Sequence, residues 1–511
     1  MKKCNYFLIF LCVIAFASCN HSYQIPQNAT LTTENLCIYP DYTDIVIPAN
    51  IAPLNFMVRN KGNEFVVVVK CGKKQIISGA GEDGKIIFDS TAWRSQLTSC
   101  KGKKMDVTLY VKREGGWIVF KNYFLQIAEE PVDAYLTYRL IEPGYELYRQ
   151  LGIYQRNVTT FDVHTIYENN RKYHKDENHC INCHNFKNYD ANTLLFHVRG
   201  NMGGTLIAKN GKVEKLNTKN DSILGSCVYP SWNPHHNWVV FSSNKTGQTF
   251  HLLKKEKTEV IDSGSDLVFY NADTKQISNI LRTPIDMETF PCWNPAGNRV
   301  YYCMCHRPEF AHIPDSMRSR DIVLNYNNVR YNLMSISFDE KTQTFGKPQL
   351  EYDCASFGKS CSVPRVSPDG RYVLFTLGDY GQFHIWHKSA DLYVKDLKTG
   401  RVYPMKASNS KDVDSFHSWS SNGRWFVFSS RRNDGSFTRP YFAYFDHNGQ
   451  SHKAFMLPQK DPEQNLLLFK SYNIPELTRN AVTYTFKQFH DAIYDYEGTP
   501  VTYKEIRKDI K

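Results

Sequence analysis

The sequence between residues 363 and 376 reads Val363-Pro364-Arg365-Val366-Ser367-Pro368-Asp369-Gly370-Arg371-Tyr372-Val373-Leu374-Phe375-Thr376. Its centre, Ser-Pro-Asp-Gly, suits a type I turn that ends in a left-handed residue. β-branched and aromatic residues follow, as on a buried strand. The segment therefore predicts a strand, a tight polar turn and a second strand.

Similar segments begin at Tyr229, Phe290 and Phe416, and a weaker one has its turn at Ala191-Asn192. Taken at one reference position, the five copies fall near residues 187, 232, 293, 366 and 419. A four-stranded propeller blade needs about 40–45 residues. The copies are spaced at that distance or farther apart, so the repeat predicts a β-propeller with its extra length in loops.

The repeat resembles the blades of the periplasmic propeller protein of the Tol–Pal system, and Ser367-Pro368-Asp369-Gly370 matches that family's turn in full. The resemblance covers roughly residues 186–450 and implies a six-bladed TolB-like propeller. Five blades are visible in the sequence. We expect residues 451–495, or the strand-like part of 131–185, to complete the ring, because closure removes exposed edges. We assign residues 186–495 to the propeller and 496–511 to a C-terminal tail.

The longest propeller loop spans residues 304–330 and holds Cys305, His306 and His312. Long loops gather on one face of a propeller and often carry its binding function. We therefore expect this loop on the binding face.

The chain before the repeat is also rich in short apolar runs. Six of them, separated by Gly- or Asn-containing turns, fall within residues 35–130, at residues 44–48, 55–58, 64–69, 85–88, 105–111 and 117–120. This spacing predicts an immunoglobulin-like β-sandwich. With 32 Tyr and 31 Phe in the chain, the fold class is all-β. No catalytic constellation falls in the sandwich, so we interpret it as a spacer or adhesion module.

The first nineteen residues form a targeting segment. Lys2 and Lys3 precede a short apolar run, and Ala17-Ser18-Cys19 then supplies small residues before a cysteine. This resembles a bacterial lipoprotein signal and implies that Cys19 is lipidated and anchors the protein in the membrane. The alternative is an ordinary cleaved signal with an incidental cysteine. Asn20 favours the periplasmic face of the outer membrane over inner-membrane retention, and residues 20–34 form a tether.

Export has consequences for partners and for cysteines. The net charge of +11 is spread along the chain, and an exported protein is not expected to bind nucleic acid. An oxidising compartment permits disulfides, but the sequence does not fix their connectivity. Nine cysteines remain when those of the signal, Cys19, Cys180 and Cys183 are set aside. Among these nine, the suggested pairs are Cys71 with Cys100 and Cys354 with Cys361.

A Tyr-rich connector, residues 131–185, ends in the motif Cys180-Ile181-Asn182-Cys183-His184. Cys-x-x-Cys-His is the pattern for covalent attachment of a c-type haem. It resembles the motif of c-type cytochromes, in which both cysteines form thioethers and the histidine binds the iron. We expect one haem c at Cys180, Cys183 and His184. A structural disulfide, a zinc site or a redox dithiol are the alternatives.

A haem iron would also need a sixth ligand. Met202 lies in a glycine-flanked loop and is the first candidate; Met/His ligation raises the reduction potential and favours electron transfer. His197, His179, His174 and His164 are the other candidates. An open sixth position would instead allow peroxidase-like or gas-binding chemistry.

Three functions follow from these features. The first is an envelope lipoprotein that uses a haem for electron transfer or redox-linked partner binding. The second is a non-haem binding or scaffold propeller that recognises an envelope protein or a glycan. The third is a propeller enzyme that cleaves glycans with paired carboxylates. No Gly-x-Ser-x-Gly elbow follows the blades, so we expect binding more than catalysis.

Overall fold

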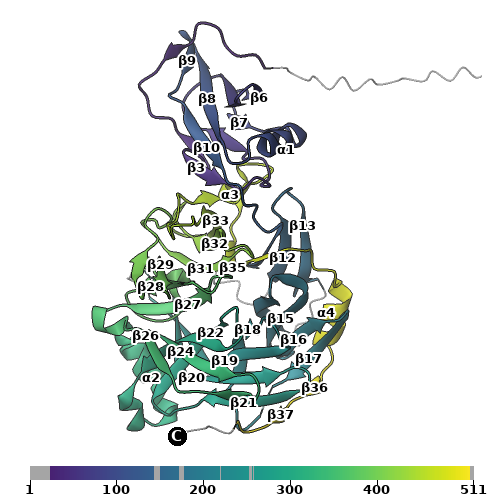
Figure 1. Cartoon of the computed structure of the whole chain (residues 1–511), viewed down its shortest axis with the longest axis vertical. Coiled ribbons are helices and arrows are strands. Elements are labelled where there is room, and N and C mark those ends of the chain that lie inside the picture. Colours follow the sequence, from purple (N-terminus) through teal and green to yellow (C-terminus); the bar gives the residue numbers. More distant parts are fainter. Residues whose placement is uncertain are drawn as a thin grey trace, which may run out of the picture.

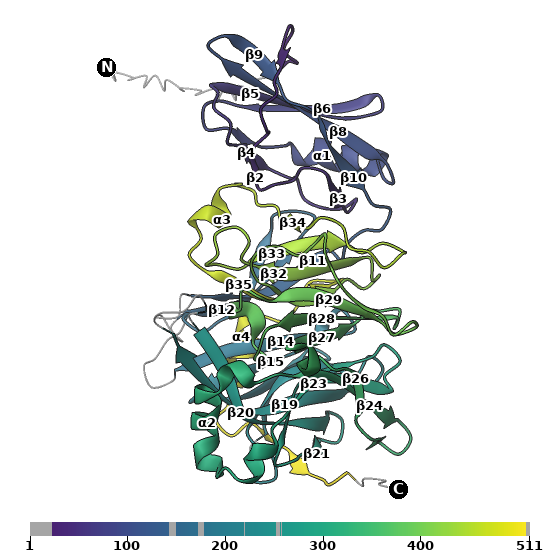
Figure 2. The ribbon, with the colours of Figure 1, turned by 90° about the vertical axis from the view of Figure 1, so that its left-hand side faces the viewer.

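The computed structural model describes residues 23–142, 150–171, 178–218, 220–251, 256 and 258–506. The chain is mostly β, with a smaller N-terminal part stacked on a larger set of sheets (Figures 1 and 2). Within the described residues, no helix has the length and apolar character that a membrane crossing requires. The expected lipidation site Cys19 and the candidate ligand His174 lie outside the described residues.

The N-terminal part contains two sheets. One has seven strands, with the order β1-β9-β8-β10-β3 and with β5 and β6 attached through β8; the other has the order β2-β4-β7. The bounds are β1 Thr30–Leu31, β2 Ile38–Tyr39, β3 Ile45–Ile47, β4 Phe56–Val58, β5 Glu64–Cys71, β6 Lys74–Ala80, β7 Lys85–Ile86, β8 Lys104–Arg113, β9 Gly116–Val119 and β10 Tyr123–Ile127. All six predicted strands are present, and the immunoglobulin-like type stays a prediction.

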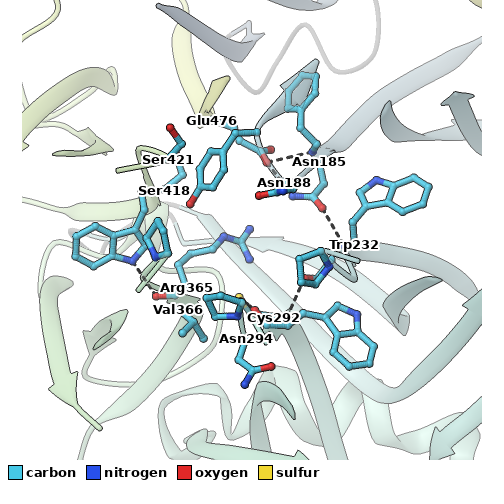
Figure 3. Close-up of a pocket in the computed structure, with 18 of the residues that line it drawn as sticks. Asn185, Asn188, Trp232, Cys292, Asn294, Arg365, Val366, Ser418, Ser421 and Glu476 are labelled. Carbon is cyan, nitrogen blue, oxygen red and sulfur yellow. Dashed lines mark hydrogen bonds between the residues drawn. The ribbon is translucent and has the colours of Figure 1, made fainter. Parts of the chain in front are cut away.

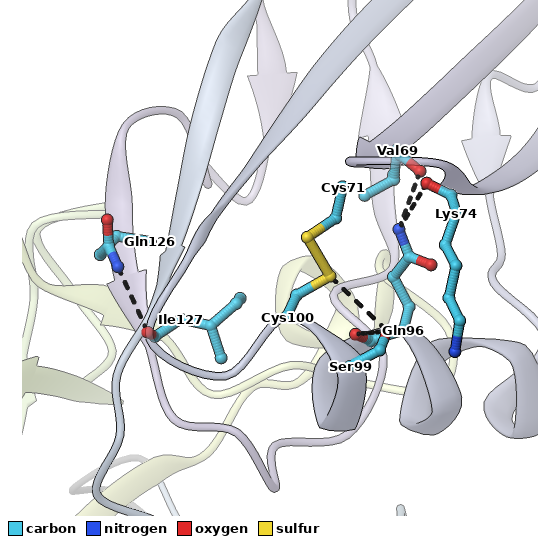
Figure 4. Close-up of a disulfide and its surroundings, with 8 residues drawn as sticks. All are labelled: Val69, Cys71, Lys74, Gln96, Ser99, Cys100, Gln126 and Ile127. Carbon is cyan, nitrogen blue, oxygen red and sulfur yellow. Dashed lines mark hydrogen bonds between the residues drawn. A yellow bond between two sulfur atoms is a disulfide. The ribbon is translucent and has the colours of Figure 1, made fainter.

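A helix that the sequence did not predict, α1 (Ser90–Ser99), packs beside these sheets. Asp89 caps it by accepting a hydrogen bond from the Ala92 backbone N–H at 2.7 Å. The disulfide Cys71–Cys100 joins the end of α1 to β5 (Figure 4). The predicted Cys71–Cys100 pair is confirmed.

Six further sheets of four or five strands follow. We call them blades 1 to 6. In blades 2 to 6 the strands follow chain order from the innermost strand outward, except that β25 and β26 of blade 4 both pair with β24. The bounds are β14 His179–Lys187, β15 Asp190–Gly200, β16 Gly204–Lys209 and β17 Lys212–Asn217; β18 Ser226–Trp232, β19 Trp238–Phe250, β20 Thr258–Asn271 and β21 Gln276–Leu281; β22 Asp286–Trp293, β23 Arg299–His306, β24 Asn332–Asp339, β25 Thr344–Phe345 and β26 Gln349–Tyr352; β27 Ser360–Val366, β28 Tyr372–Gly378, β29 Asp391–Asp396 and β30 Val402–Pro404; β31 Asp414–Trp419, β32 Trp425–Ser430, β33 Arg439–Tyr444 and β34 Phe455–Met456.

Blade 1 is built from both ends of this region. Its order is β13-β12-β11-β35, with β11 Tyr135–Ile141, β12 Leu151–Asn157, β13 Val163–Glu168 and β35 Ser471–Thr478. The six innermost strands contact one another in turn, and β35 touches both β14 and β31, so the ring closes. The arrangement is β-propeller-like. Most of the predicted connector, residues 131–185, therefore forms three strands of blade 1. The fourth strand comes from residues 451–495, the other segment that was expected to complete the ring.

The C-terminal residues also differ from the expected tail. Two short strands, β36 (Thr499–Pro500) and β37 (Thr502–Tyr503), pair in parallel with β17 and β21. They extend the outer edges of blades 2 and 3. The tail thus covers strand edges that would otherwise be open.

Each innermost strand has the same irregularity. One residue has a left-handed backbone with φ between 47° and 56°, and the pairing register shifts there; the residues are Cys183, Tyr229, Phe290, Val363, Phe416 and Ile474. The next residue is proline in four blades and histidine in two. Proline is tolerated at a bulge because no ladder N–H is needed there. A bulge changes the direction in which the following side chain points. In these strands, that direction determines which side chains face the centre of the ring.

The N-terminal part shares its core with blade 6. One hydrophobic cluster includes Val67 and Trp93 of the N-terminal part together with Phe442 and Phe455 of the blade. Tyr42 also donates a hydrogen bond from Oη to the Met456 carbonyl at 3.3 Å. The two parts therefore bury apolar surface against each other.

Candidate functional site

The central channel holds a cavity of about 420 Å³ at the ends of the innermost strands (Figure 3). We call it the channel pocket. Each blade contributes one residue from the same strand position: Asn185, Ser231, Cys292, Arg365, Ser418 and Glu476. Each of these residues lies two positions after the left-handed residue of its strand. The shared bulge thus turns six side chains, distant in sequence, toward one space.

Arg365 is the central cation of the channel pocket. Its guanidinium extends from β27 toward the middle of the cavity (Figure 3). Nη1 lies 3.5 Å from the Pro364 carbonyl, and Arg365 forms no ion pair with any described residue. The Trp419 indole N–H donates to the Arg365 carbonyl at 3.0 Å, which fixes the strand. The cation is therefore held in place but has its charge available.

Glu476 faces Arg365 from blade 1. Its Oε1 accepts hydrogen bonds from Asn185 Nδ2 at 2.9 Å and from the Phe186 backbone N–H at 3.1 Å. Burial raises the pKa of Glu476 to about 7, although the Arg365 charge acts in the opposite direction. Near neutral pH the carboxyl is therefore protonated to a much greater extent than an exposed glutamate. With Arg479 also in the lining, the pocket keeps a net positive charge.

Amide and hydroxyl groups complete the lining. Asn188, Asn294 and Ser421 lie at the turns beyond the strands. Ser231 accepts a hydrogen bond from the Trp293 backbone N–H at 3.0 Å, and Ser418 donates to the Pro475 carbonyl at 2.8 Å. These contacts position the side chains and leave further donors and acceptors for a polar ligand.

The Cys-x-x-Cys-His motif lies on β14, the innermost strand of blade 2. Cys180 is 5% exposed, Cys183 3% and His184 3%. Burial raises the pKa of the Cys183 thiol, and burial with the Arg139 charge lowers the pKa of His184 to about 3. Both ring nitrogens of His184 lack a hydrogen bond of normal geometry. The imidazole is therefore neutral, as an iron ligand must be.

Other features of the motif do not fit a haem. The channel pocket and three further cavities among the described residues are not lined by Cys180, Cys183 or His184. Cys183 occupies the left-handed position that every blade shares, and His184 matches His417 of blade 6 and the prolines of the other blades. The motif thus has a structural place in the blade. Because the three side chains are at most 5% exposed, a porphyrin could join them only if this part of blade 2 opened.

The candidate sixth ligands are spread around blade 2. Met202 is 2% exposed and shares a hydrophobic cluster with Cys180. His179 Nε2 is 2.9 Å from the Tyr167 hydroxyl. His197 Nδ1 is 3.3 Å from Thr205 Oγ1. His197 also lines a separate cavity, at the end of β14 that is farther from the channel pocket. The exposed His164 lies on β13.

The loop at 304–330 contains a helix, α2 (Asp315–Leu324), between short turns of 3₁₀ helix. His306 Nδ1 is 2.6 Å from Asp286 at the start of β22. The channel pocket lies at the other end of that strand, so the loop, with Cys305 and His312, does not line it. Among the described residues, no group of three or more His, Cys, Asp or Glu side chains could hold a metal ion.

The second suggested disulfide is wrong in this structure. Cys354 and Cys361 are both free and buried. The Cys361 thiol contacts the Cys354 thiol without a disulfide and also approaches Cys303, with the sulfurs of Cys361 and Cys303 3.2 Å apart. Pairing between neighbouring blades could not be inferred from sequence spacing.

The sequence did not identify the six residues of the channel pocket. Four of them directly precede the reference positions of the repeat that lie near residues 232, 293, 366 and 419. Blade 1, which was not visible as a repeat in the sequence, also carries a recognisable pattern. Ile474-Pro475-Glu476-Leu477 has the same apolar-Pro-x-apolar pattern as Phe290-Pro291-Cys292-Trp293. Aligning all innermost strands would have placed the six residues in one ring.

The chain has only distant similarity to known proteins. No protein-family model and no curated protein matches it. A prolyl endopeptidase structure matches at 9% identity over 63% of this chain and 42% of its own, with a TM-score of 0.33. An oligogalacturonate lyase in complex with manganese matches at 12% identity over 63% and 85%, with a TM-score of 0.31. An ancestral GH74 enzyme matches at 8% identity over 64% and 38%, with a TM-score of 0.31.

Proposed function

We propose that this protein is a binding protein of the bacterial cell envelope, with a six-bladed TolB-type propeller that recognises a polar envelope ligand in the channel pocket. One observation carries the proposal: six blades each aim one residue into the same cavity, and Arg365 stands in it with no ion-pair partner among the described residues. A partly buried cation without an ion-pair partner has lost some of its hydration, and an anionic ligand would compensate for that loss.

The proposal includes the location of the protein. Cys19 carries lipid and anchors the chain at the periplasmic face of the outer membrane. The N-terminal sheets then separate the propeller from the membrane, and the partner is an envelope protein or a glycan. A Cys19→Ser variant should lose incorporation of labelled palmitate and leave the outer-membrane fraction; unchanged labelling would contradict this part.

Obstructing the mouth of the channel pocket tests the binding function. His235 is exposed at the rim of the pocket, and tryptophan there should narrow the entrance. His312 is exposed on a loop away from the pocket, so His312→Trp is the matched control. We expect the full-length mature protein and the control to co-sediment with isolated peptidoglycan sacculi or outer membranes, and His235→Trp to do so at least several-fold less. Equal binding by both variants, or no binding by the wild type, would reject the function.

A c-type haem for electron transfer or redox-linked binding is the second candidate. It is favoured by the complete Cys180–Cys183–His184 motif and by the unpartnered ring nitrogens of His184. The protein should be expressed where cytochrome c maturation operates and examined on a denaturing gel stained for haem. A stained band that Cys183→Ala abolishes would establish the haem. No stain and no Soret absorption would leave the motif a structural part of blade 2.

A further inference from the structure

We propose that the ligand of the channel pocket is an acidic sugar, a hexuronate unit of a glycan, whose carboxylate pairs with Arg365. The inference rests on the proposed function and names its ligand class. It depends on the charge of the pocket, on the geometry of the cation and on the chemistry of the surrounding groups.

The charge of the lining selects an anion. The lining holds two arginines, Arg365 and Arg479, and a single carboxyl group, Glu476. Arg479 donates from Nη2 to the Asn188 carbonyl at 3.0 Å. Glu476 is already engaged by two donors of blade 2. The unsatisfied charge of the pocket is therefore the guanidinium of Arg365.

The geometry favours a carboxylate. A guanidinium presents two parallel N–H groups, which match the two oxygens of a carboxylate. Figure 3 shows the guanidinium of Arg365 among the other labelled residues that line the channel pocket. A volume of about 420 Å³ lies in the range of about 300–1,000 Å³ that small-ligand sites occupy. A sugar ring can therefore enter with its carboxylate.

The remaining groups suit a sugar more than a peptide end. Asn188 offers an amide donor and acceptor for sugar hydroxyls. Asn185 and Asn294 each use one amide N–H in an internal hydrogen bond and keep the second N–H as a donor. Ser231, Ser418 and Ser421 add hydroxyls. Apolar surface comes from Tyr189 and from turn prolines, listed here: Pro234, Pro295 and Pro368. Burial raises the pKa of Tyr189, so its ring stays neutral and can lie against the C–H face of a sugar.

Glu476 should make the affinity depend on pH. The groups that face it are Asn185 and the Phe186 backbone on β14, Arg365 on β27, and Tyr189 beyond β14. Above neutral pH the ionised carboxyl competes with the ligand for Arg365. Below it the carboxyl is protonated and the competition ends. The affinity for a uronate should therefore rise from pH 8 to pH 6, and Glu476→Gln should reduce this change.

Titration calorimetry with the full-length mature protein tests the inference. The probes are a hexuronate trisaccharide, its neutral hexose counterpart, and a short peptide with a free or an amidated C-terminus. We expect the uronate to bind at least tenfold more tightly than the neutral sugar. Arg365→Gln should weaken uronate binding about 10- to 100-fold, as expected for loss of a charged hydrogen-bonded pair. Arg320, exposed on α2, supplies the control Arg320→Gln, which should change nothing.

The outcomes separate this inference from the proposed function. Equal affinity for the neutral sugar, or unchanged uronate binding by Arg365→Gln, would overturn the acidic-sugar assignment. Binding of only the free-carboxylate peptide through Arg365 would also overturn it, while the binding function would stand. Arg365→Lys keeps the charge and lacks the fork, so it should bind the uronate with intermediate affinity; this variant guards against a folding defect in Arg365→Gln. If His235→Trp also leaves envelope binding intact, the proposed function fails as well.

Discussion

Replacing Glu476 with glutamine should remove one source of pH dependence from the stability of the fold. Burial raises the pKa of Glu476 from 4.5 to about 7. Between these two values the folded protein binds more protons at this site than the unfolded chain does. The free energy of unfolding therefore falls as pH rises through that window and is level above it. At 1.36 kcal/mol per pKa unit, the loss is at most about 3 kcal/mol.

Glutamine is a close substitute at this position. Its side-chain oxygen can still accept the hydrogen bonds from Asn185 and from the Phe186 backbone, and it cannot ionise. The stability of Glu476→Gln relative to the wild type should therefore increase from pH 5 to pH 7 and then stay constant. Urea unfolding followed by tryptophan fluorescence, at pH 5, 6, 7 and 8 and fixed ionic strength, measures this difference. Glu82→Gln, at an exposed turn, should show none.

One result would refute the reasoning. If the stability difference between Glu476→Gln and the wild type were independent of pH, or fell as pH rises, Glu476 would be ionised in the folded protein across this range. An ionised Glu476 would neutralise Arg365. The argument that Arg365 is free to bind an anionic ligand would then fail together with the pH prediction.

Three further predictions concern stability. Reduction of Cys71–Cys100, which closes a loop of 29 residues, should destabilise the N-terminal sheets by about 3–4 kcal/mol, measured by urea unfolding with and without reductant. Asp89→Ala removes the cap of α1 and should cost about 1 kcal/mol, whereas Asp89→Asn should cost little; equal losses would argue against capping. Arg439 is 1% exposed and donates hydrogen bonds to several backbone carbonyls near α3 (Gln464–Leu467). Lysine lacks the planar guanidinium that makes these bonds, so Arg439→Lys should lower the melting temperature by several degrees.

The repeating part of the fold could be predicted because its signal is local. Each strand–turn–strand unit has its own turn residues and its own buried strand, as at Ser367–Gly370. The closing blade was harder, because its strands come from residues 135–168 and 471–478. Nothing local indicates that two segments so far apart share one sheet. The helix α1 was missed because only three of its ten residues are buried, which leaves a weak apolar stripe.

The channel pocket could not be predicted from residue types alone. It depends on a left-handed backbone at residues such as Tyr229, Val363 and Ile474, and these residue types rarely adopt that conformation. All six innermost strands adopt it at the equivalent position, although the residue types differ, so the shared fold and not the residue type determines it. The backbone preferences of these residue types therefore do not predict the bulge. Only the repetition of the pattern across blades reveals which side chains meet.

The same bulge bears on the haem motif. Cys183 and His184 occupy the left-handed position and its successor, which the other five blades fill with residues that bind no haem. In blade 6 the successor is His417, whose Nε2 lies 2.9 Å from the Leu374 carbonyl, so a histidine fits this place without iron. Thioether bonds at both cysteines would bring a porphyrin to a strand whose side chains are already enclosed. A covalent haem would therefore require blade 2 to open around β14 (His179–Lys187), and haem staining of the wild type beside Cys183→Ala tests whether it does.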